Sequence, residues 1–158
     1  MDQKKQASAF KAANATVVGD VTLEADVNIW YGAVLRGDSG AITVGAGTNI
    51  QDNCVLHEKT TIGKYCTIGH GAIVHGCEIG DCCTIGMGSV ILTGAKLGDH
   101  CLVGAGALVT GKMVAPAGSV ILGSPAKVVK EVSQEQLDDM AASAQHYIEL
   151  AKESLPDY

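Results

Sequence analysis

Aliphatic residues recur every six positions along most of the chain. They form three runs, which are Val17, Leu23, Ile29 and Leu35; Val44, Ile50, Leu56, Ile62, Ile68 and Val74; and Ile79, Ile85, Ile91, Leu97, Val103 and Val109. The frame slips by three residues between the first and second runs, and by one residue between the second and third. Such a fixed period indicates a repeat architecture.

The residues next to the aliphatic positions repeat as well. Glycine often follows directly, as at Gly63 and Gly80, and a small or β-branched residue stands four positions after, as at Thr48 and Cys66. Six residues make one short strand and one corner, three such units close a triangular coil of ~18 residues, and coils stack ~4.8 Å apart. An α-helix is disfavoured, because regularly spaced glycines cost roughly 0.5–1 kcal/mol each in helix interiors. The pattern therefore predicts a mainly β fold built as a parallel β-helix.

Residues 14–128 resemble the hexapeptide-repeat family, as segments such as TIGKYCTIGHGAIV and IGDCCTIGMGSVI illustrate. The resemblance implies a left-handed β-helix of triangular coils, which we assign to residues 1–128, and a homotrimer. Pro125 fits a chain that leaves the coil, and Ser133 and Gln136 fit a capping box at a helix start. Residues 129–158 are therefore expected to form a linker and an amphipathic α-helix that packs on the β-helix. Its apolar positions would be Leu137, Met140, Ala144, Tyr147, Ile148, Ala151 and Leu155.

Composition narrows the class of protein. Glycine accounts for 20 of 158 residues and aromatic residues for only 4%, which favours a narrow core of aliphatic and small side chains. The net charge of −6 and the lack of a Lys/Arg run argue against a nucleic-acid partner. No apolar stretch approaches the ~20 residues that cross a bilayer. Residues 1–11 are polar and lack the apolar core of a signal peptide, so we expect a cytoplasmic protein with no membrane partner.

The six cysteines are expected to be free thiols, as is usual in a cytoplasmic protein. Four of them occupy the small inward position of the repeat, namely Cys54, Cys66, Cys83 and Cys101. They are predicted to fill the core as small apolar side chains. Cys77 and Cys82 fall at outward positions, so the repeat predicts that they are surface thiols.

Three of the five histidines have a spacing that suggests a metal site. His57 and His75 are one coil apart, and they should stack on one edge where both imidazoles can bind one ion. His70 projects from a different face, so a threefold trimer is needed to bring it to the same ion from a neighbouring subunit. The alternative is that the three are ordinary surface or core histidines. His100 and His146 have no such partner and are expected at the surface.

The segments NIWYGAVLRGD, TNIQDNCVLH and IGHGAIVHG resemble those of the γ-class carbonic anhydrases. The resemblance implies that His57, His70 and His75 bind zinc between subunits. Three imidazoles leave one position for a water whose pKa falls to about 7, and the hydroxide can attack carbon dioxide to give bicarbonate. Imidazole also suits iron or cobalt.

The same resemblance implies roles for five further residues, which are Arg36, Asp38, Asn49, Gln51 and Tyr147. Gln51 is expected to touch the metal-bound solvent or the substrate. Arg36 and Asp38 are expected to pair across subunits, and a plain salt bridge that holds the trimer is an equal alternative. Asn49 and the adjacent Asp52 are alternatively corner residues that bond local backbone.

The chain departs from the family at the proton-transfer step. Only twelve residues separate His57 from His70, so the acidic loop that carries the family's shuttle glutamate is absent. Ser39 stands where the family has a second glutamate, Glu149 takes an asparagine position, and Glu58 is a substitute candidate for the shuttle. Two other functions therefore stay open, an acyltransferase that uses acyl-coenzyme A and a non-catalytic trimer held together by metal.

Overall fold

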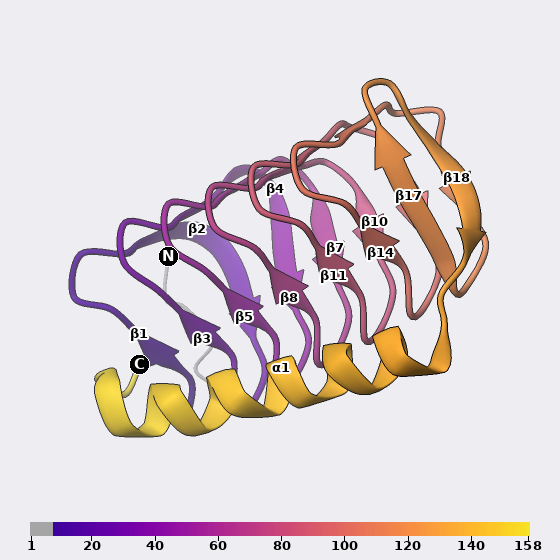
Figure 1. The fold of residues 1–158 in the computed structure, drawn as a ribbon. Helices are drawn as coiled ribbons and strands as arrows, with labels where there is room; N and C mark the ends of the chain where they lie inside the picture. Colours follow the sequence, from indigo (N-terminus) through magenta and orange to yellow (C-terminus); the bar gives the residue numbers. More distant parts are fainter. Residues whose placement is uncertain (1–7) are drawn as a thin grey trace.

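The computed structural model describes residues 8–158, so the first seven residues of the predicted 1–128 domain lie outside it. The chain winds into stacked coils, with helix α1 running along the stack (Figure 1). One sheet contains β1 (Phe10–Lys11), β3 (Asn28–Ile29), β5 (Asn49–Ile50), β8 (Thr67–Ile68), β11 (Thr84–Ile85), β14 (Leu102–Val103), β17 (Ser119–Gly123) and β18 (Ala126–Glu131). The other contains β2 (Thr16–Leu23), β4 (Val34–Val44), β6 (Val55–His57), β7 (Thr60–Ile62), β9 (Ile73–His75), β10 (Glu78–Ile79), β12 (Val90–Ile91), β13 (Lys96–Leu97), β15 (Leu108–Val109) and β16 (Val114–Ala115).

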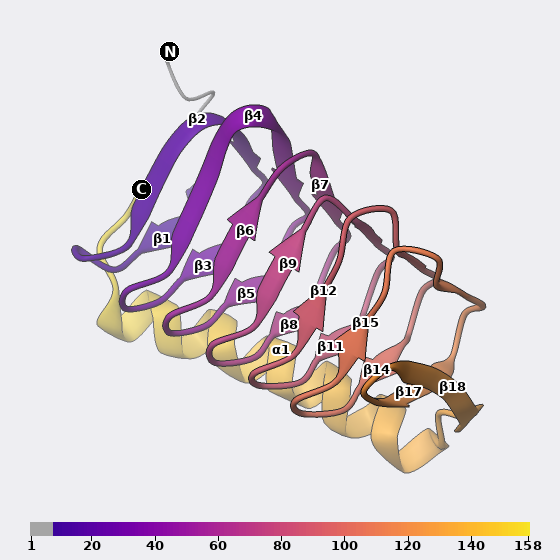
Figure 2. The ribbon, with the colours of Figure 1, turned by 90° about the horizontal axis from the view of Figure 1, so that it is seen from above.

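The second of these sheets bends into two faces, because β4 continues around a corner. Its first part pairs with β6 and its last part with β7, both in parallel. The solenoid therefore has three faces. We call β1, β3, β5, β8, β11, β14 and β17 the first face, β6, β9, β12 and β15 with the start of β4 the second face, and β7, β10, β13 and β16 with the end of β4 the third face. Figure 2 looks onto the second face. The predicted fold class, a mainly β parallel β-helix with a C-terminal helix, is confirmed.

The pairing register explains both slips of the hexapeptide frame. Leu56 pairs with Val74 and Ile91 with Val109, and each pair is separated by one regular coil of three hexapeptides. Leu35 pairs with Leu56 across a coil that is three residues longer, and Val74 pairs with Ile91 across a coil that is one residue shorter. The three extra residues lie between Arg36 and Ile42, and the missing residue lies between Gly76 and Glu78. Both irregular corners lie on the edge between the second and third faces.

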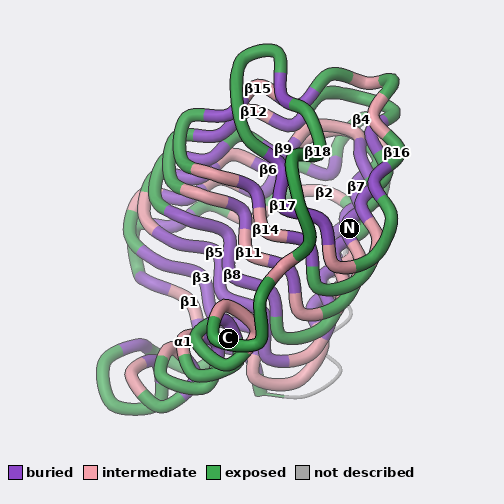
Figure 3. Tube along the Cα trace, turned by 45° about the vertical axis from the view of Figure 1, so that its right-hand side comes forward, coloured by how far each residue is buried: buried purple, intermediate pink, exposed green. Residues whose placement is uncertain are grey.

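The core is the column of inward aliphatic residues, and Figure 3 shows buried segments recurring along the successive coils. Ile29, Ile50, Ile68 and Ile85 are among its fully buried members. Packing of this kind contributes about 1.5–3 kcal/mol for each large aliphatic side chain that leaves water. The six-residue repeat therefore places aliphatic side chains inside every coil, and these side chains form one continuous apolar core.

The four predicted inward cysteines are buried, and all six cysteines are free thiols. The prediction for Cys77 is wrong, because its side chain is only 2% exposed. The residue missing from this corner shifts Cys77 into the small inward position between Thr60 and Ala95, as the pairing of the next residues shows. Burial raises the pKa of the Cys77 thiol to about 12. Cys82 is half-buried at a corner.

The C-terminal part closes both ends of the solenoid. The chain does not simply leave the coil at Pro125, since β17 and β18 form an antiparallel hairpin across the Ser124–Pro125 peptide. Helix α1 (Gln134–Ser154) begins at the predicted capping box, with both reciprocal bonds between Ser133 and Gln136 present. Its buried residues are Met140, Ala144, Ile148 and Ala151.

Helix α1 contacts β3, β5 and β8 and so covers part of the first face. Beyond it, the Tyr158 N–H donates to the Ala9 carbonyl at 2.8 Å, which places the C-terminal residues beside β1 (Figure 1). Within residues 8–158, no helix combines the length and the apolar character that a membrane span needs.

Candidate metal centre

His57 and His75 are the last residues of β6 and β9, on the edge between the second and third faces. Each follows a buried aliphatic residue, Leu56 or Val74, so strand alternation turns both imidazoles outward. The two residues are direct partners in the pairing register. Their rings face each other, with Nδ1 of His57 3.3 Å from Nε2 of His75. We call this side of the solenoid the paired-histidine edge.

This separation fits a shared metal ion. Two nitrogens that each bind one ion at ~2.0–2.1 Å in tetrahedral geometry lie about 3.3 Å apart. Both imidazoles are half-buried, and both nitrogens are ring atoms that coordinate divalent metals in their neutral form. The donor set of this edge therefore suits zinc or a related first-row metal.

Each histidine of the pair has a further partner on its other ring nitrogen. Nδ1 of His75 lies 2.7 Å from the hydroxyl oxygen of Thr93. Nε2 of His57 lies 3.2 Å from the hydroxyl oxygen of Ser39 and 3.3 Å from Oδ1 of Asp38. Partners of this kind orient metal-binding imidazoles. Thr93 was not predicted from the sequence, although it follows His75 by 18 residues, which is the spacing that paired the two histidines.

Arg36 and Asp38 contact each other within the chain, with Nη1 2.9 Å from Oδ2. Both side chains are about half exposed. The hydrogen bond from Arg36 is the main cause that lowers the pKa of Asp38, against the opposing effect of desolvation. Asp38 lies in the segment with the three extra residues, directly after Arg36, which pairs with His57. Asp38 therefore stays anionic beside that imidazole.

Glu58 also lies at the paired-histidine edge. Its backbone has a φ of 62°, a left-handed conformation that the following coils give to Gly76 and Gly94 at the same corner. The Ser39 hydroxyl donates to Oε1 of Glu58 at 3.1 Å, and this oxygen is 4.0 Å from Nδ1 of His57. One donor atom from each of His57, Glu58 and His75 lies within 4.8 Å of the others. Other corner residues such as Tyr65 and Cys82 share this left-handed conformation, so the feature that points to a function for Glu58 is the position of its carboxylate beside two imidazoles.

His70 lies on the opposite edge of the second face, just before β9. It is exposed, and its Nδ1 is 3.1 Å from Oδ1 of Asp52. His75 ends the same strand five residues later, which places the two imidazoles on the order of 15 Å apart along the strand. We call this side the single-histidine edge. Within one chain His70 does not join the other two histidines.

Asn49 and Gln51 are buried near the single-histidine edge, at the end of β5. The Gln51 side-chain amide donates to the Asn49 side-chain oxygen at 3.0 Å. The Asn49 amide in turn donates to the hydroxyl of Thr67 and to the carbonyl of Cys66. Asn49 thus holds Gln51 in a fixed orientation next to Asp52.

Tyr147 of helix α1 belongs to the same edge. Its ring packs edge-on against Trp30, with centroids 5.5 Å apart. Partial burial, and next the negative charge of Asp52, raise the pKa of the Tyr147 phenol. His100 and His146 are both exposed, as the sequence predicted.

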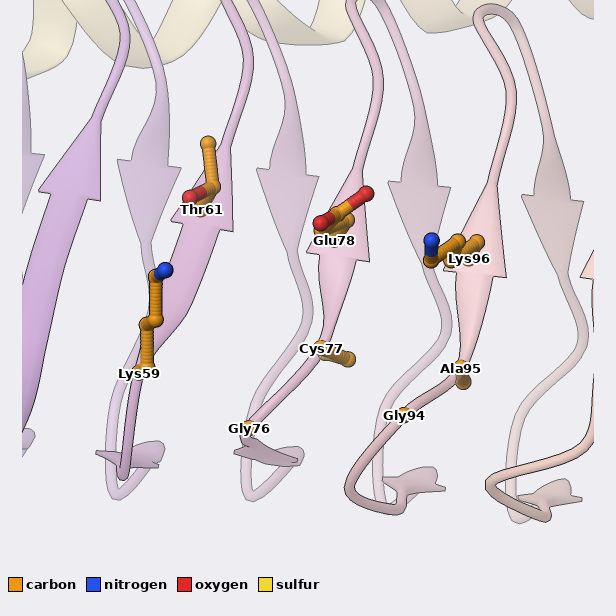
Figure 4. Close-up of a pocket in the computed structure, with 8 residues that line it drawn as sticks. All are labelled: Lys59, Thr61, Gly76, Cys77, Glu78, Gly94, Ala95 and Lys96. Carbon is orange, nitrogen blue, oxygen red and sulfur yellow. The ribbon is translucent and has the colours of Figure 1, made fainter.

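A shallow pocket of about 180 Å³ opens on the third face, around the corner from the paired histidines (Figure 4). Lys59, Glu78 and Lys96 line it from successive coils, and Cys77 lies at its margin. Its lining includes Gly76 and Gly94, which directly follow His75 and Thr93 in the sequence. The pocket therefore adjoins the paired-histidine edge without including either imidazole.

Comparison with known proteins identifies the family of this chain. Residues 41–76 and 76–111 match the family described as "Bacterial transferase hexapeptide (six repeats)". A protein of Methanocaldococcus jannaschii named "Probable carbonic anhydrase" is 44% identical over 93% of this chain and 94% of its own length. The mitochondrial γ carbonic anhydrase 2 of Arabidopsis thaliana is 41% identical over 90% of this chain, and the chain spans only 55% of that relative.

A solved structure shows the same fold. The hexapeptide transferase family protein of Anaplasma phagocytophilum superposes with a TM-score of 0.89 at 44% identity, over 93% of this chain and 89% of the other. The repeat, the paired histidines and these similarities lead to one conclusion. The chain belongs to the γ-carbonic-anhydrase-like members of the hexapeptide-repeat family.

Proposed function

We propose that this chain is a metal-dependent carbonic anhydrase that converts carbon dioxide and water reversibly to bicarbonate. The observation that carries the proposal is the 3.3 Å separation of Nδ1 of His57 and Nε2 of His75, which matches two ligands of one tetrahedral ion. Relatives named as carbonic anhydrases at 41–44% identity support it. The metal is proposed to be zinc, with iron or cobalt as alternatives for a site of imidazoles.

The proposal includes a homotrimer, and the second face supports it. Its outward positions form an apolar stripe in one continuous register, namely Val34, Val55, Ile73, Val90 and Leu108. The corresponding outward positions of the third face include Thr43, Thr61, Glu78 and Lys96. An apolar stripe on one face and polar residues on another are typical of a protein that buries the first face against other copies.

A threefold arrangement around the second face would also complete the metal site. In a closed ring, each subunit presents two different edges, and one edge of a subunit meets the opposite edge of the next. The paired-histidine edge would then face the neighbour's single-histidine edge. His57 and His75 of one subunit and the corresponding His70 of the neighbour would bind one ion, with three such sites in the trimer.

The bound metal would supply an activated water at neutral pH. The residues of the chain bind and orient the reactants. Gln51, held by Asn49, is proposed to position the substrate, and Tyr147 to shield that side from solvent. Arg36 and Asp38 would hold His57 through its Nε2. Glu58 is proposed to pass the released proton to buffer, because its Oε1 lies 4.0 Å from Nδ1 of His57, the nitrogen that faces His75.

Glu58 also favours a second candidate function, a trimer that is held together by metal and does no chemistry. A zinc site with four protein ligands is closed and structural, whereas a catalytic site keeps one open position. Oε1 of Glu58 is near enough to become the fourth ligand beside three histidines. An acyltransferase needs only one general base, and the opposed imidazoles at 3.3 Å argue against it.

One experiment separates these functions. The protein is purified without oxygen, its metal content is measured, and carbon dioxide hydration is followed for the wild type, His75→Ala, Glu58→Gln and the control His146→Ala. We expect the wild type and the control to hold one metal ion per chain and to be active. His75→Ala should lose metal and lower hydration more than about 100-fold, since changing only a partner of a ligand already costs roughly 10–100-fold.

Glu58→Gln should lower the rate in weak buffer and recover in concentrated buffer. A gain of hydration in Glu58→Gln from an inactive wild type would instead support the closed structural site. Metal-loaded wild-type protein with no hydration at any pH, also after this substitution, contradicts the carbonic anhydrase proposal. Tight binding of coenzyme A by metal-free protein would support the acyltransferase.

A further inference from the structure

The paired-histidine edge carries a continuous column of side-chain contacts across four coils. Ser39 contacts His57, His57 faces His75, and His75 contacts Thr93. The contact of Thr93 is the shortest of these, at 2.7 Å from Nδ1 of His75. It also differs in kind, because Nε2 of His57 has two oxygens beside it whereas Nδ1 of His75 has the single hydroxyl of Thr93.

We infer that Thr93 is a positioning residue, whose hydroxyl selects the protonation form of His75 that can bind metal through Nε2. This inference rests on the proposed metal function of the same site. A neutral imidazole carries its proton on one nitrogen only, and the hydrogen bond at that nitrogen fixes which one. With the proton on Nδ1 and donated to Oγ1 of Thr93, Nε2 keeps its lone pair and points it at the space shared with Nδ1 of His57.

A local irregularity of the solenoid creates this contact. Val74 pairs with Ile91, but one corner further the Gly94 N–H donates to the Gly76 carbonyl at 2.9 Å. The register therefore places Leu92 opposite His75, and the two residues Thr93 and Gly94 opposite the single residue Gly76. Such a bulge redirects the side chains around it, and here it brings the Thr93 hydroxyl back toward the preceding coil.

Gly76 leaves room for the Thr93 side chain. A Cβ at position 76 would lie 2.8 Å from Oγ1 and 2.9 Å from Cγ2 of Thr93. The Thr93 side chain therefore occupies the space that the Cβ of any larger residue at position 76 would need. Because a β-branched side chain has few rotamers, the packing against Gly76 holds the hydroxyl in place. Thr93 itself is exposed, so its substitution leaves the apolar core intact.

The test compares Thr93→Val, which keeps the shape and removes the hydroxyl, with Thr93→Ser, which keeps the hydroxyl. Thr61→Val, an outward threonine of β7 on the third face, is the matched control. Two properties are measured, the affinity of metal-free protein for zinc and cobalt, and the ¹⁵N NMR shifts of the His75 ring in metal-free protein. The first reports binding, and the second reports the protonation form before any metal is added.

We expect Thr93→Val to bind metal about 10–100-fold more weakly, the usual effect of removing a partner of a metal-binding histidine. Its His75 shifts should move from the Nδ1-protonated pattern toward an average of the two neutral forms. Thr93→Ser should restore both properties, and Thr61→Val should match the wild type. Wild-type affinity and wild-type His75 shifts in Thr93→Val would overturn the role of Thr93.

The result is separable from the proposed function. If the wild type binds metal tightly but does not hydrate carbon dioxide, the enzymatic proposal fails while the comparison of Thr93→Val with Thr93→Ser still decides the role of Thr93. If Thr93→Val lost its thermal stability together with its affinity while Thr93→Ser also stayed weak, a merely structural role would be indicated, and this too would overturn the inference.

Discussion

The two edges of the second face differ sharply, although the same short strands run from one to the other. The paired-histidine edge carries His57 and His75 on successive coils, and their ring nitrogens already lie 3.3 Å apart. The single-histidine edge carries only His70, exposed and held by Asp52. One edge therefore brings two candidate ligands together, and the other edge carries one candidate ligand.

In the proposed trimer, this difference couples the binding of metal to the assembly of subunits, because the width of one sheet face separates His70 from His75. His70 and His75 belong to the two sides of strand β9, so a subunit cannot bring both to one ion. The two stacked histidines supply two ligands for one ion, and in the proposed site the third ligand comes from a neighbouring subunit. Experiments that change one edge at a time therefore test whether the two edges meet at one ion.

The largest effect is expected from mixing subunits. His75→Ala and His70→Ala should each lower hydration more than about 100-fold, because each removes one ligand from every site. In a random mixture of the two variants, one site in four joins an intact His57/His75 pair to an intact His70, so about a quarter of the wild-type activity should return. Activity is measured after co-expression and purification of mixed trimers. A mixture as inactive as its parts would show that the two edges do not meet.

The next effect concerns the apolar stripe between the edges. Ile73 is 40% exposed at the centre of the second face. Ile73→Glu should place an unpaired charge in the proposed interface, which costs several kcal/mol and converts the trimer to monomers. Thr61→Glu makes the same change at the middle of β7 on the third face and should leave the trimer intact. Light scattering gives the mass, and metal content should fall together with it.

The smallest effect is expected at the partner of His70. Asp52→Asn keeps an oxygen that can accept a hydrogen bond from Nδ1 of His70 but removes its charge, so metal affinity should fall by no more than about 10-fold. Asp138→Asn on the outer side of helix α1 serves as the control. Metal titration of the two variants checks this. A loss as large as that of His75→Ala would mean that Asp52 is itself a ligand.

Most of the fold could be predicted because every coil repeats the same spacing of inward aliphatic and small residues. The six-residue period identified the inward residues, and the two frame slips even marked the irregular corners beside His57 and His75. The hairpin of β17 and β18 could not be predicted in this way, since a terminal element occurs once and has no repeat to compare with. Cys77 was misplaced for a related reason, because a corner that lacks one residue shifts the following side chain to the other side.

The sequence predicted that His57 and His75 lie together, but it did not predict the side chains that contact them. The one-coil spacing placed His57 and His75 together, but a hydroxyl at the same spacing carries no chemical signal by itself. Thr93 became recognisable only when the bulge opposite Gly76, the residue after His75, was visible. Likewise, the contact of Ser39 with both His57 and Glu58 depends on the path of the three inserted residues, which the period does not determine.

The covered ends of the stack decide the direction in which these molecules can associate. A pile of parallel strands presents open hydrogen-bonding groups at each end, and unprotected ends would let one molecule continue another without limit. At one end the exposed β18 carries Lys127, Lys130 and Glu131, and at the other the stretch from Pro156 to Tyr158 bonds to Ala9 and Lys11. These two elements cover the ends of the first face and so disfavour growth into a fibre along the axis. Copies can then associate through the side faces of the solenoid, where a closed ring gives an assembly of limited size.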